Sequence, residues 1–183
     1  MLFNFSWVIP NKLAGSNMPG GISNTCIFDS FELIKDLLKL KELGINTIFS
    51  IVEELPKNFK EQCKSMDLEH MWFPVNDFDI PNDLDKYRNL IDYVTNLILL
   101  GKVVTVHCKM GIGRTGTTLA CIIGLLNNFN SEEAIKYVRH FRPNSIENQK
   151  QIKFIQLFLD KKISESNIKG VFENDEQGNR QVH

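Results

Sequence analysis

The sequence predicts an α/β domain in which helices flank a central, mostly parallel twisted sheet. Apolar, β-branched runs of strand length alternate along the chain with longer segments of helical periodicity. Alternation of this kind is typical of strand–helix–strand units, whose strands lie parallel. Open sheets of this class place their functional site at the carboxyl ends of the strands, so we expect the active site there.

The expected elements follow one another with short connections. Strands are expected over residues 5–10, 45–52, 68–75 and 102–106, and residues 14–28 are expected to form a loop. Helices are expected over residues 29–43, 56–65 and 83–100. Three further helices are expected after the glycine-rich segment 107–116: one that ends near residue 128, one opened by residues 131–133 and one opened by residues 145–148.

Two of these helices carry a periodic apolar face. The 29–43 helix has Asp29 or Ser30 as its N-cap, and Gly44 follows its end. Its predicted apolar face consists of Phe31, Ile34, Leu37 and Leu38. The predicted face of the 83–100 helix consists of Leu84, Tyr87, Ile91, Val94 and Ile98.

Length and composition indicate one ordinary domain. The chain has 183 residues, 43% hydrophobic and 23% charged, with a net charge of −1, so we expect no nucleic-acid partner. We expect a monomeric domain over residues 1–163 and a polar, disordered tail over residues 164–183. The four cysteines show no disulfide or metal spacing, and we find no signal, membrane-span or lipidation pattern. These features predict a cytoplasmic or nuclear protein without a membrane anchor.

The segment Val106–Gly116 carries most of the chemical information. Cys108 and Arg114 lie six positions apart, after the apolar 102–106 strand and before the apolar run that begins at Thr117. Gly111 and Gly113 allow the backbone N–H groups of residues 109–113 to turn inward as an anion-binding nest at a helix N-terminus. Arg114 adds a planar fork of donors suited to phosphate oxygens. Such a cup binds a phosphate and favours the thiolate form of a cysteine at its base.

The predicted phosphate-binding set consists of Lys109, Met110, Gly111, Ile112, Gly113 and Arg114. His107-Cys108, five intervening residues and Arg114-Thr115 form the signature of the protein tyrosine phosphatase superfamily, which the chain resembles. Residues 4–15 and 139–147 also resemble the small atypical dual-specificity phosphatases of the VHZ group. The resemblance covers roughly residues 4–160. It implies an α/β phosphatase fold with a phosphate loop between a strand and a helix.

The resemblance also implies roles for individual residues. Cys108 would be the nucleophile, and an aspartate in the 76–82 loop would protonate the leaving group. Asp77, followed four residues later by Pro81, is favoured over Asp79. Thr115 would donate its hydroxyl to the departing thiolate. Three residues would support the reaction: His107 would organise the loop, Glu147 would brace it and Gln151 would position the attacking water.

The expected activity is hydrolysis of phosphotyrosine, and of phosphoserine or phosphothreonine, in phosphoprotein partners, without a metal or other cofactor. Three alternatives stay open: a phosphoinositide phosphatase, an RNA 5′-phosphatase and a catalytically silent phosphate-binding module. Relatives that act on inositol lipids or RNA often place extra basic residues in the loop, whereas only Lys109 precedes Arg114 here. Silent modules usually lack the cysteine or the arginine, and this chain has both.

Overall fold

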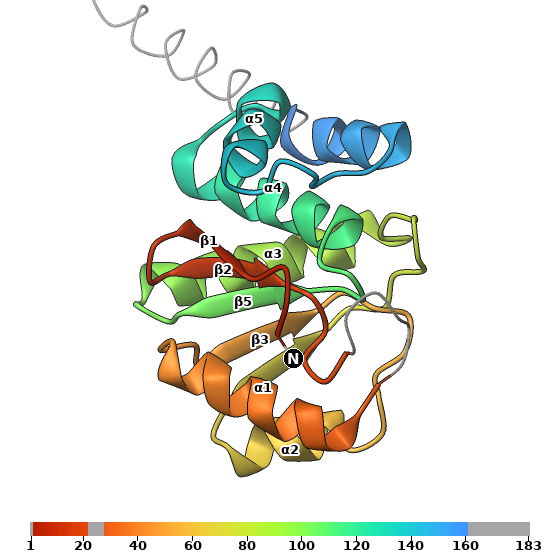
Figure 1. Cartoon of the computed structure of the whole chain (residues 1–183). Helices are drawn as coiled ribbons and strands as arrows, with labels where there is room; N and C mark the ends of the chain where they lie inside the picture. The colour runs from red at the N-terminus through yellow and green to blue at the C-terminus, as the bar shows by residue number, and fades with distance from the viewer. Residues whose placement is uncertain (1, 22–27, 161–183) are drawn as a thin grey trace, which may run out of the picture.

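The computed structural model of the protein describes residues 2–21 and 28–160. A twisted five-stranded sheet lies at the centre of this part of the chain (Figure 1). The strands are β1 (Ser6–Ile9), β2 (Leu13–Ser16), β3 (Thr47–Ser50), β4 (Glu69–Trp72) and β5 (Val104–His107). The helices are α1 (Ser30–Glu42), α2 (Phe59–Ser65), α3 (Leu84–Leu99), α4 (Gly113–Asn127) and α5 (Ser131–Phe141), followed by a helical segment over residues 149–160. The predicted α/β class is confirmed, and the predicted tail lies outside the described residues.

The strand order is β1-β2-β5-β3-β4, and only the β1–β2 pair is antiparallel. Strands β3 and β5 are therefore parallel neighbours at the centre of the sheet. Their last residues, Ser50 and His107, lie directly opposite one another. The segments that follow these two strands consequently leave the sheet side by side, at the edge where an α/β sheet places its site.

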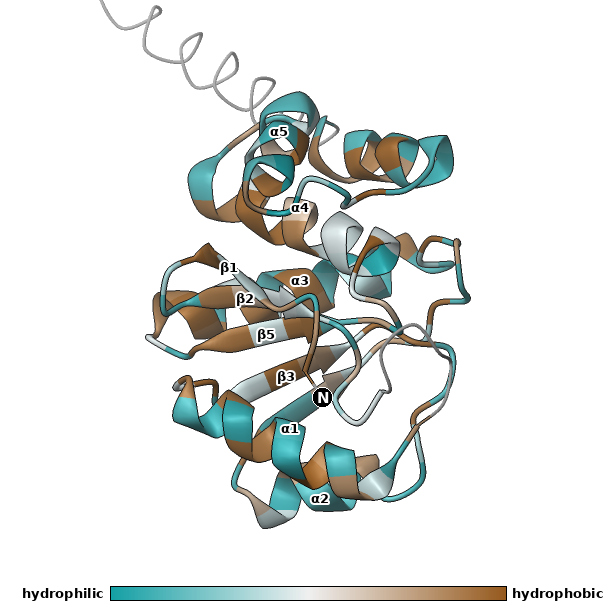
Figure 2. Ribbon diagram, in the orientation of Figure 1, coloured by the Kyte–Doolittle hydropathy of each residue, from teal (hydrophilic) through white to brown (hydrophobic). Residues whose placement is uncertain are grey.

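Helices cover both faces of the sheet (Figures 1 and 2). Helices α1 and α2 pack on one face around a core that includes Leu37, Ile48 and Phe59. Helices α3, α4 and α5, together with the 149–160 segment, enclose a larger core on the other face, where Tyr87 is fully buried. Each central strand is covered on both faces, which explains why its sequence reads as a continuous apolar run.

Strand β2 was missed by the sequence prediction, which assigned most of it to a loop. Its four residues are all fully buried between β1 and β5. The cause is the small residues Ala14, Gly15 and Ser16, which lack strand propensity of their own. Gly15 is needed there because a Cβ atom would lie 3.0 Å from the Arg142 guanidinium carbon.

The predicted face of α1 is also wrong in part. Phe31, Ile34 and Leu38 are 65%, 37% and 49% exposed. The helix instead buries Leu33, Asp36, Leu37 and Leu40. Asp36 is compatible with burial because its carboxylate accepts a hydrogen bond from the Gly20 backbone at 2.9 Å. Asp29 is the N-cap, and its side chain accepts hydrogen bonds from the backbone of residues 31 and 32. The predicted face of α3 is confirmed from Tyr87 to Ile98, whereas Leu84 is half-buried.

Candidate active site

The loop between β5 and α4 wraps its backbone around the sulfur of Cys108. Gly111 adopts a φ of +74°, and a Cβ atom there would lie 2.3 Å from the Ser16 carbonyl oxygen, so only glycine fits. The Gly111 N–H donates a hydrogen bond to Cys108 Sγ at 3.3 Å. Cys108 is 3% exposed at the base of this loop. The sulfur thus lies beside an inward-pointing amide at the N-terminus of α4, a setting that favours negative charge.

Arg142 and Asn4 hold the outer side of the loop. Arg142 Nη2 donates to the Gly111 carbonyl at 2.5 Å, and Asn4 Nδ2 donates to the Met110 carbonyl at 2.8 Å. Arg142 Nη1 also donates to the Gly15 carbonyl at 2.9 Å and to Ser6 Oγ at 2.6 Å. The C=O and N–H of a trans peptide point in opposite directions. Anchoring the loop carbonyls outward therefore directs the neighbouring amides inward.

Arg142→Met is expected to destabilise the fold by about 3–5 kcal/mol, because several buried acceptors lose a charged donor and each such loss costs about 1–3 kcal/mol. Burial lowers the pKa of Arg142 to about 10, so the side chain is still a cation at neutral pH. Chemical denaturation would measure the loss. Lys136→Met on the exposed face of α5 is the control, and equal stability of the two variants would contradict the anchoring role.

Arg114 contacts groups from two other segments of the chain, one after β3 and one after β4. Its Nη1 atom donates to Glu53 Oε2 at 2.6 Å and to the Val75 carbonyl at 2.8 Å, and its Nη2 atom donates to Asp77 Oδ1 at 2.6 Å. The Arg114 side chain is only 2% exposed. A guanidinium held along one edge by a carboxylate and a carbonyl is fixed in orientation, which suits it to bidentate recognition of a phosphate.

Glu53 is a site residue that sequence reasoning missed. Partial burial alone would raise its pKa, but hydrogen bonds from Lys109, its own backbone and Arg114 lower the pKa to about 2. Glu53 thus ion-pairs with both basic residues of the phosphate loop. The available signal was its place just after β3, the strand beside β5, but only the strand order reveals that adjacency.

Glu53→Gln is expected to lower kcat/KM about tenfold to a hundredfold, because misplacing a binding group by about 1 Å has effects of the larger size. Glu54→Gln, at the exposed neighbouring position, is the control, and both variants are assayed with one aryl phosphate as substrate. The lowered pKa of Glu53 stabilises the fold fully above pH 4.5, and this contribution is lost as pH falls toward 2. Thermal melts should therefore show less acid sensitivity below pH 4.5 in Glu53→Gln than in the wild type. Unchanged kinetics in Glu53→Gln would show that Arg114 needs no such brace.

The two candidate acids of the 76–82 loop face different partners. Asp77 pairs with Arg114 at 2.6 Å, whereas Asp79 pairs with Lys150 and accepts the Ile80 N–H at 2.8 Å. Between them, Phe78 has a φ of +57°, and its carbonyl accepts a hydrogen bond from Asn148 Nδ2 at 3.0 Å. The loop thus presents Asp77 to the phosphate loop and directs Asp79 toward the 149–160 helix.

Glu147 and Gln151 lie against the first turn of α4, next to the phosphate loop. A Cβ atom on Gly113 would lie 2.0 Å from Glu147 Oε2 and 2.7 Å from Gln151 Nε2. Gln151 is fully buried, and its Oε1 accepts the Glu147 N–H at 2.8 Å. Its Nε2 atom has no hydrogen-bond partner among the described residues. Burial and the charge of Asp77 raise the pKa of Glu147, although a hydrogen bond from the Gly113 backbone and the charge of Arg114 act in the opposite direction.

Thr115 and His107 flank the loop from inside the core. Thr115 Oγ1 is buried without a hydrogen-bond partner among residues 2–21 and 28–160. His107 is fully buried, with Nε2 2.6 Å from Ser50 Oγ and Nδ1 3.3 Å from the Cys108 carbonyl oxygen. Burial lowers the pKa of His107 to about 3, so its imidazole is neutral. The structure thus brings together all the residues that the sequence singled out, except Asp79.

In the described part of the chain no group of three or more His, Cys, Asp or Glu side chains is arranged to hold a metal ion. The same residues contain no helix that is long and apolar enough to span a membrane.

An α/β sheet with a cysteine- and arginine-bearing loop between strand and helix defines the class of cysteine-dependent phosphatases. Over residues 27–161 the sequence matches the family described as "Dual specificity phosphatase, catalytic domain". Because the match spans most of the chain, the protein belongs to this family. The resemblance noted from the sequence to the protein tyrosine phosphatase superfamily is thereby confirmed.

Curated relatives and solved structures agree with this membership. Phosphatidylglycerophosphate phosphatase PTPMT2 of Arabidopsis thaliana is 27% identical over 135 residues, 72% of this chain and 59% of that protein. Protein tyrosine phosphatase domain-containing protein 1 of Bos taurus is 27% identical over 169 residues, 89% of this chain and 21% of that protein. The chain thus spans less than two thirds of either relative.

Two solved structures show the same fold. The kinase associated phosphatase superposes with a TM-score of 0.74 at 24% identity, over 86% of this chain and 94% of that one. A PTPMT1 complex with PI(5)P superposes with a TM-score of 0.71 at 17% identity, over 88% of this chain and 98% of that one.

Proposed function

We propose that the protein hydrolyses phosphotyrosine, and phosphoserine or phosphothreonine, in proteins through a cysteinyl-phosphate intermediate. The observation that carries the proposal is the 2.6 Å contact between Arg114 Nη2 and Asp77 Oδ1, beside the Cys108 loop. This contact joins the Arg114 guanidinium and the Asp77 carboxylate, which come from two distant parts of the sequence, next to the loop that carries the Cys108 thiol. This combination supplies the nucleophile, the anion clamp and the proton donor that phosphoester cleavage needs.

In the first step the Cys108 thiolate attacks phosphorus, and the bond to the leaving oxygen breaks. Protonated Asp77 gives its proton to that oxygen, while the loop amides and Arg114 hold the phosphoryl oxygens. In the second step water attacks the cysteinyl phosphate and loses a proton to Asp77. Gln151, whose Nε2 lies beside Gly113 and has no partner among the described residues, orients this water, and Thr115 donates its buried hydroxyl to the departing thiolate.

Phosphate binding requires Asp77 to yield its place on Arg114. The guanidinium edge that bears Nη2 is occupied by the Asp77 carboxylate, and Nη1 is held by Glu53 and Val75. A phosphate that docks on the Nη2 edge displaces the carboxylate. Because the Asp77 side chain is 48% exposed, its loop position allows this exchange without breaking core contacts. The displaced acid then lies next to the leaving group.

Protein substrates are favoured by the rim of the site. Phe78, 63% exposed next to Asp77, presents an aromatic face against which the ring of a phosphotyrosine can pack. Lys109 is already paired with Glu53, so little unpaired positive charge remains for a polyphosphorylated inositol head group or an RNA end. The large phosphotyrosine-specific domains deepen their pocket with an aromatic loop, and the sequence shows no such segment, so phosphoserine and phosphothreonine should also reach Cys108.

A lipid phosphomonoester is the second candidate substrate. Two Arabidopsis thaliana relatives are named phosphatidylglycerophosphate phosphatases, at 27% and 28% identity. Cleavage of the terminal phosphate of such a lipid has a primary alkoxide as its leaving group, as cleavage of phosphoserine does. The same phosphate loop and the same general acid, Asp77, would therefore serve both substrates. An RNA 5′ end and a silent binding role have no comparable support in the structure.

A substrate panel tests the proposal. The full chain would be assayed on matched phosphotyrosine and phosphothreonine peptides, phosphatidylglycerophosphate micelles, PI(5)P and 5′-triphosphorylated RNA, with and without a chelator. We expect the highest kcat/KM on phosphotyrosine, measurable turnover of phosphothreonine and no effect of the chelator. A higher kcat/KM on either lipid would assign the protein to the lipid phosphatases, and the absence of all turnover would leave only the binding role.

A further inference from the structure

A series of hydrogen bonds connects the phosphate loop with a pocket on the far side of β3. Ser50 Oγ lies 2.6 Å from His107 Nε2 and 2.8 Å from His70 Nε2. His107 Nδ1 in turn lies 3.3 Å from the carbonyl oxygen of Cys108. The ring of Phe59 packs against both imidazoles, with centroid distances of 5.2 Å and 5.6 Å. Ser50 and His70 take no part in the reaction steps proposed above.

The chemistry of these groups determines the direction of every bond. A carbonyl oxygen only accepts, so His107 Nδ1 carries the proton and its Nε2 is an acceptor. Ser50 must therefore donate its single hydroxyl proton to His107 Nε2. The Ser50 oxygen then accepts from His70, whose proton must be on Nε2. The chain runs His70 to Ser50 to His107 to Cys108, and each link orients the next.

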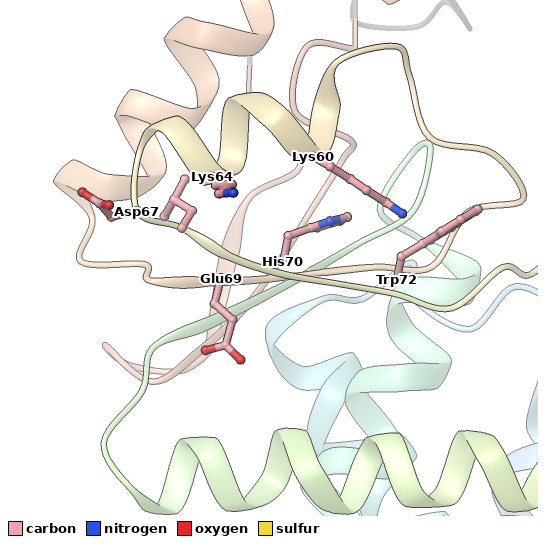
Figure 3. Close-up of a pocket in the computed structure, with 7 residues that line it drawn as sticks. Lys60, Lys64, Asp67, Glu69, His70 and Trp72 are labelled. Atoms are coloured by element: carbon pink, nitrogen blue, oxygen red, sulfur yellow. The ribbon is translucent and has the colours of Figure 1, made fainter.

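The His70 end of this series of hydrogen bonds is open to solvent. His70 lines a pocket of about 590 Å³ between α2 and β4, with Lys60, Lys64 and Trp72 among its neighbours (Figure 3). The Lys60 ammonium lies 4.8 Å from the centre of the Trp72 ring. Burial and the charge of Lys60 lower the pKa of His70 to about 4, so at neutral pH the imidazole has one N–H. That N–H donates to Ser50 Oγ and not to solvent in the pocket.

We propose that His70 is a positioning residue for the nucleophile: it orients the Ser50 hydroxyl, which fixes His107 and through it the backbone of Cys108. This role rests on the proposed function of Cys108. Without the N–H of His70, the bond to His107 Nε2 alone orients the Ser50 hydroxyl, so the neutral His107 ring is held less firmly. The loop amides and Arg114 keep their own supports, Arg142 and Glu53. The chain therefore acts on the sulfur more than on phosphate affinity.

Three variants separate positioning from general damage. His70→Leu removes the donor, His70→Gln keeps an N–H donor at the end of the side chain, and Lys64→Gln alters the same pocket away from Ser50. We expect kcat on an aryl phosphate to fall about tenfold to a hundredfold in His70→Leu, because displacing a reacting group by about 1 Å can cost about a hundredfold in rate. The rate of Cys108 alkylation by iodoacetamide should fall in parallel. KM and inhibition by inorganic phosphate should stay within about twofold. His70→Gln should recover most of the loss, and Lys64→Gln should behave as the wild type.

Wild-type kcat and alkylation in His70→Leu would overturn the inference, as would equal losses in His70→Leu and His70→Gln. If His70→Leu fails to fold, Ser50→Ala removes the middle link, and full activity in that variant would overturn the inference equally. Failure of the proposed role of Cys108 is distinguishable. In that case the wild type would show either no turnover or turnover that survives in Cys108→Ser. The alkylation rates would still report on His70 in that case.

Discussion

Cys108→Ser is expected to reduce turnover of an aryl phosphate to the background rate while phosphate binding survives. The serine hydroxyl stays protonated in a site built to stabilise a thiolate, so no adequate nucleophile remains. The Gly111 amide that donates to Sγ at 3.3 Å stabilises negative charge on sulfur, and serine oxygen has little of that charge to offer. The anion-binding groups, Arg114 and the loop amides, are unchanged.

Two measurements check this prediction. Steady-state assays give the loss of kcat, and protection of the fold by inorganic phosphate or vanadate gives the retained binding. Cys121→Ala is the control, because Cys121 is fully buried in α4 and burial raises the pKa of its thiol. Activity above a trace in Cys108→Ser would rule out a cysteinyl-phosphate intermediate. Loss of binding as well as turnover would instead indicate a collapsed loop.

The phosphate loop could be predicted because its information is local. Cys108, Arg114 and the two glycines lie within seven residues, and the strand before them and the helix after them have unmistakable apolar patterns. The face of α1 could not be chosen in the same way. Phe31, Ile34 and Leu38 form one stripe at helical spacing, and Leu33, Leu37 and Leu40 form another. Only tertiary packing on β3 and its neighbours decided between them, and it buried the second stripe together with Asp36.

The outer part of the site depends on adjacencies that no local pattern encodes. Glu53 reaches Arg114 because β3 and β5 are neighbours, although 61 residues separate the two side chains. Arg142 reaches Gly111 because α5 returns over β1 and β2. The sequence did not indicate β2, because most of its residues are small and have little strand propensity. Sequence reasoning therefore found the groups proposed to act on the phosphate but missed Glu53, Arg142 and Asn4, which hold Arg114 and the loop. The choice between Asp77 and Asp79 stayed open for the same reason, since it depends on Lys150 and Arg114.

Asp77→Asn is expected to slow hydrolysis by about 10²- to 10⁴-fold for esters of poor leaving groups, the usual contribution of a general acid. For an ester whose leaving group has a low pKa the loss should be much smaller, because that oxygen departs without a proton. The effect should thus grow steadily with the leaving-group pKa across a series of aryl and alkyl phosphates. Vanadate should bind the variant at least as tightly as the wild type, since the competing carboxylate on Arg114 has been removed.

Asp79→Asn is the matched control, one position beyond Phe78 in the same loop. Its carboxylate pairs with Lys150 on the exposed side of the 149–160 helix, so its loss should leave the leaving-group dependence unchanged. A steep dependence in Asp79→Asn with a flat one in Asp77→Asn would reassign the acid, and would require the loop to rotate about the left-handed Phe78 before reaction. Flat dependences in both variants would direct attention to Glu147, the remaining carboxyl group beside Gly113, whose pKa burial raises. A carboxyl that retains its proton at higher pH is suited to donate it, so Glu147→Gln in the same ester series would then decide which carboxyl protonates the leaving group.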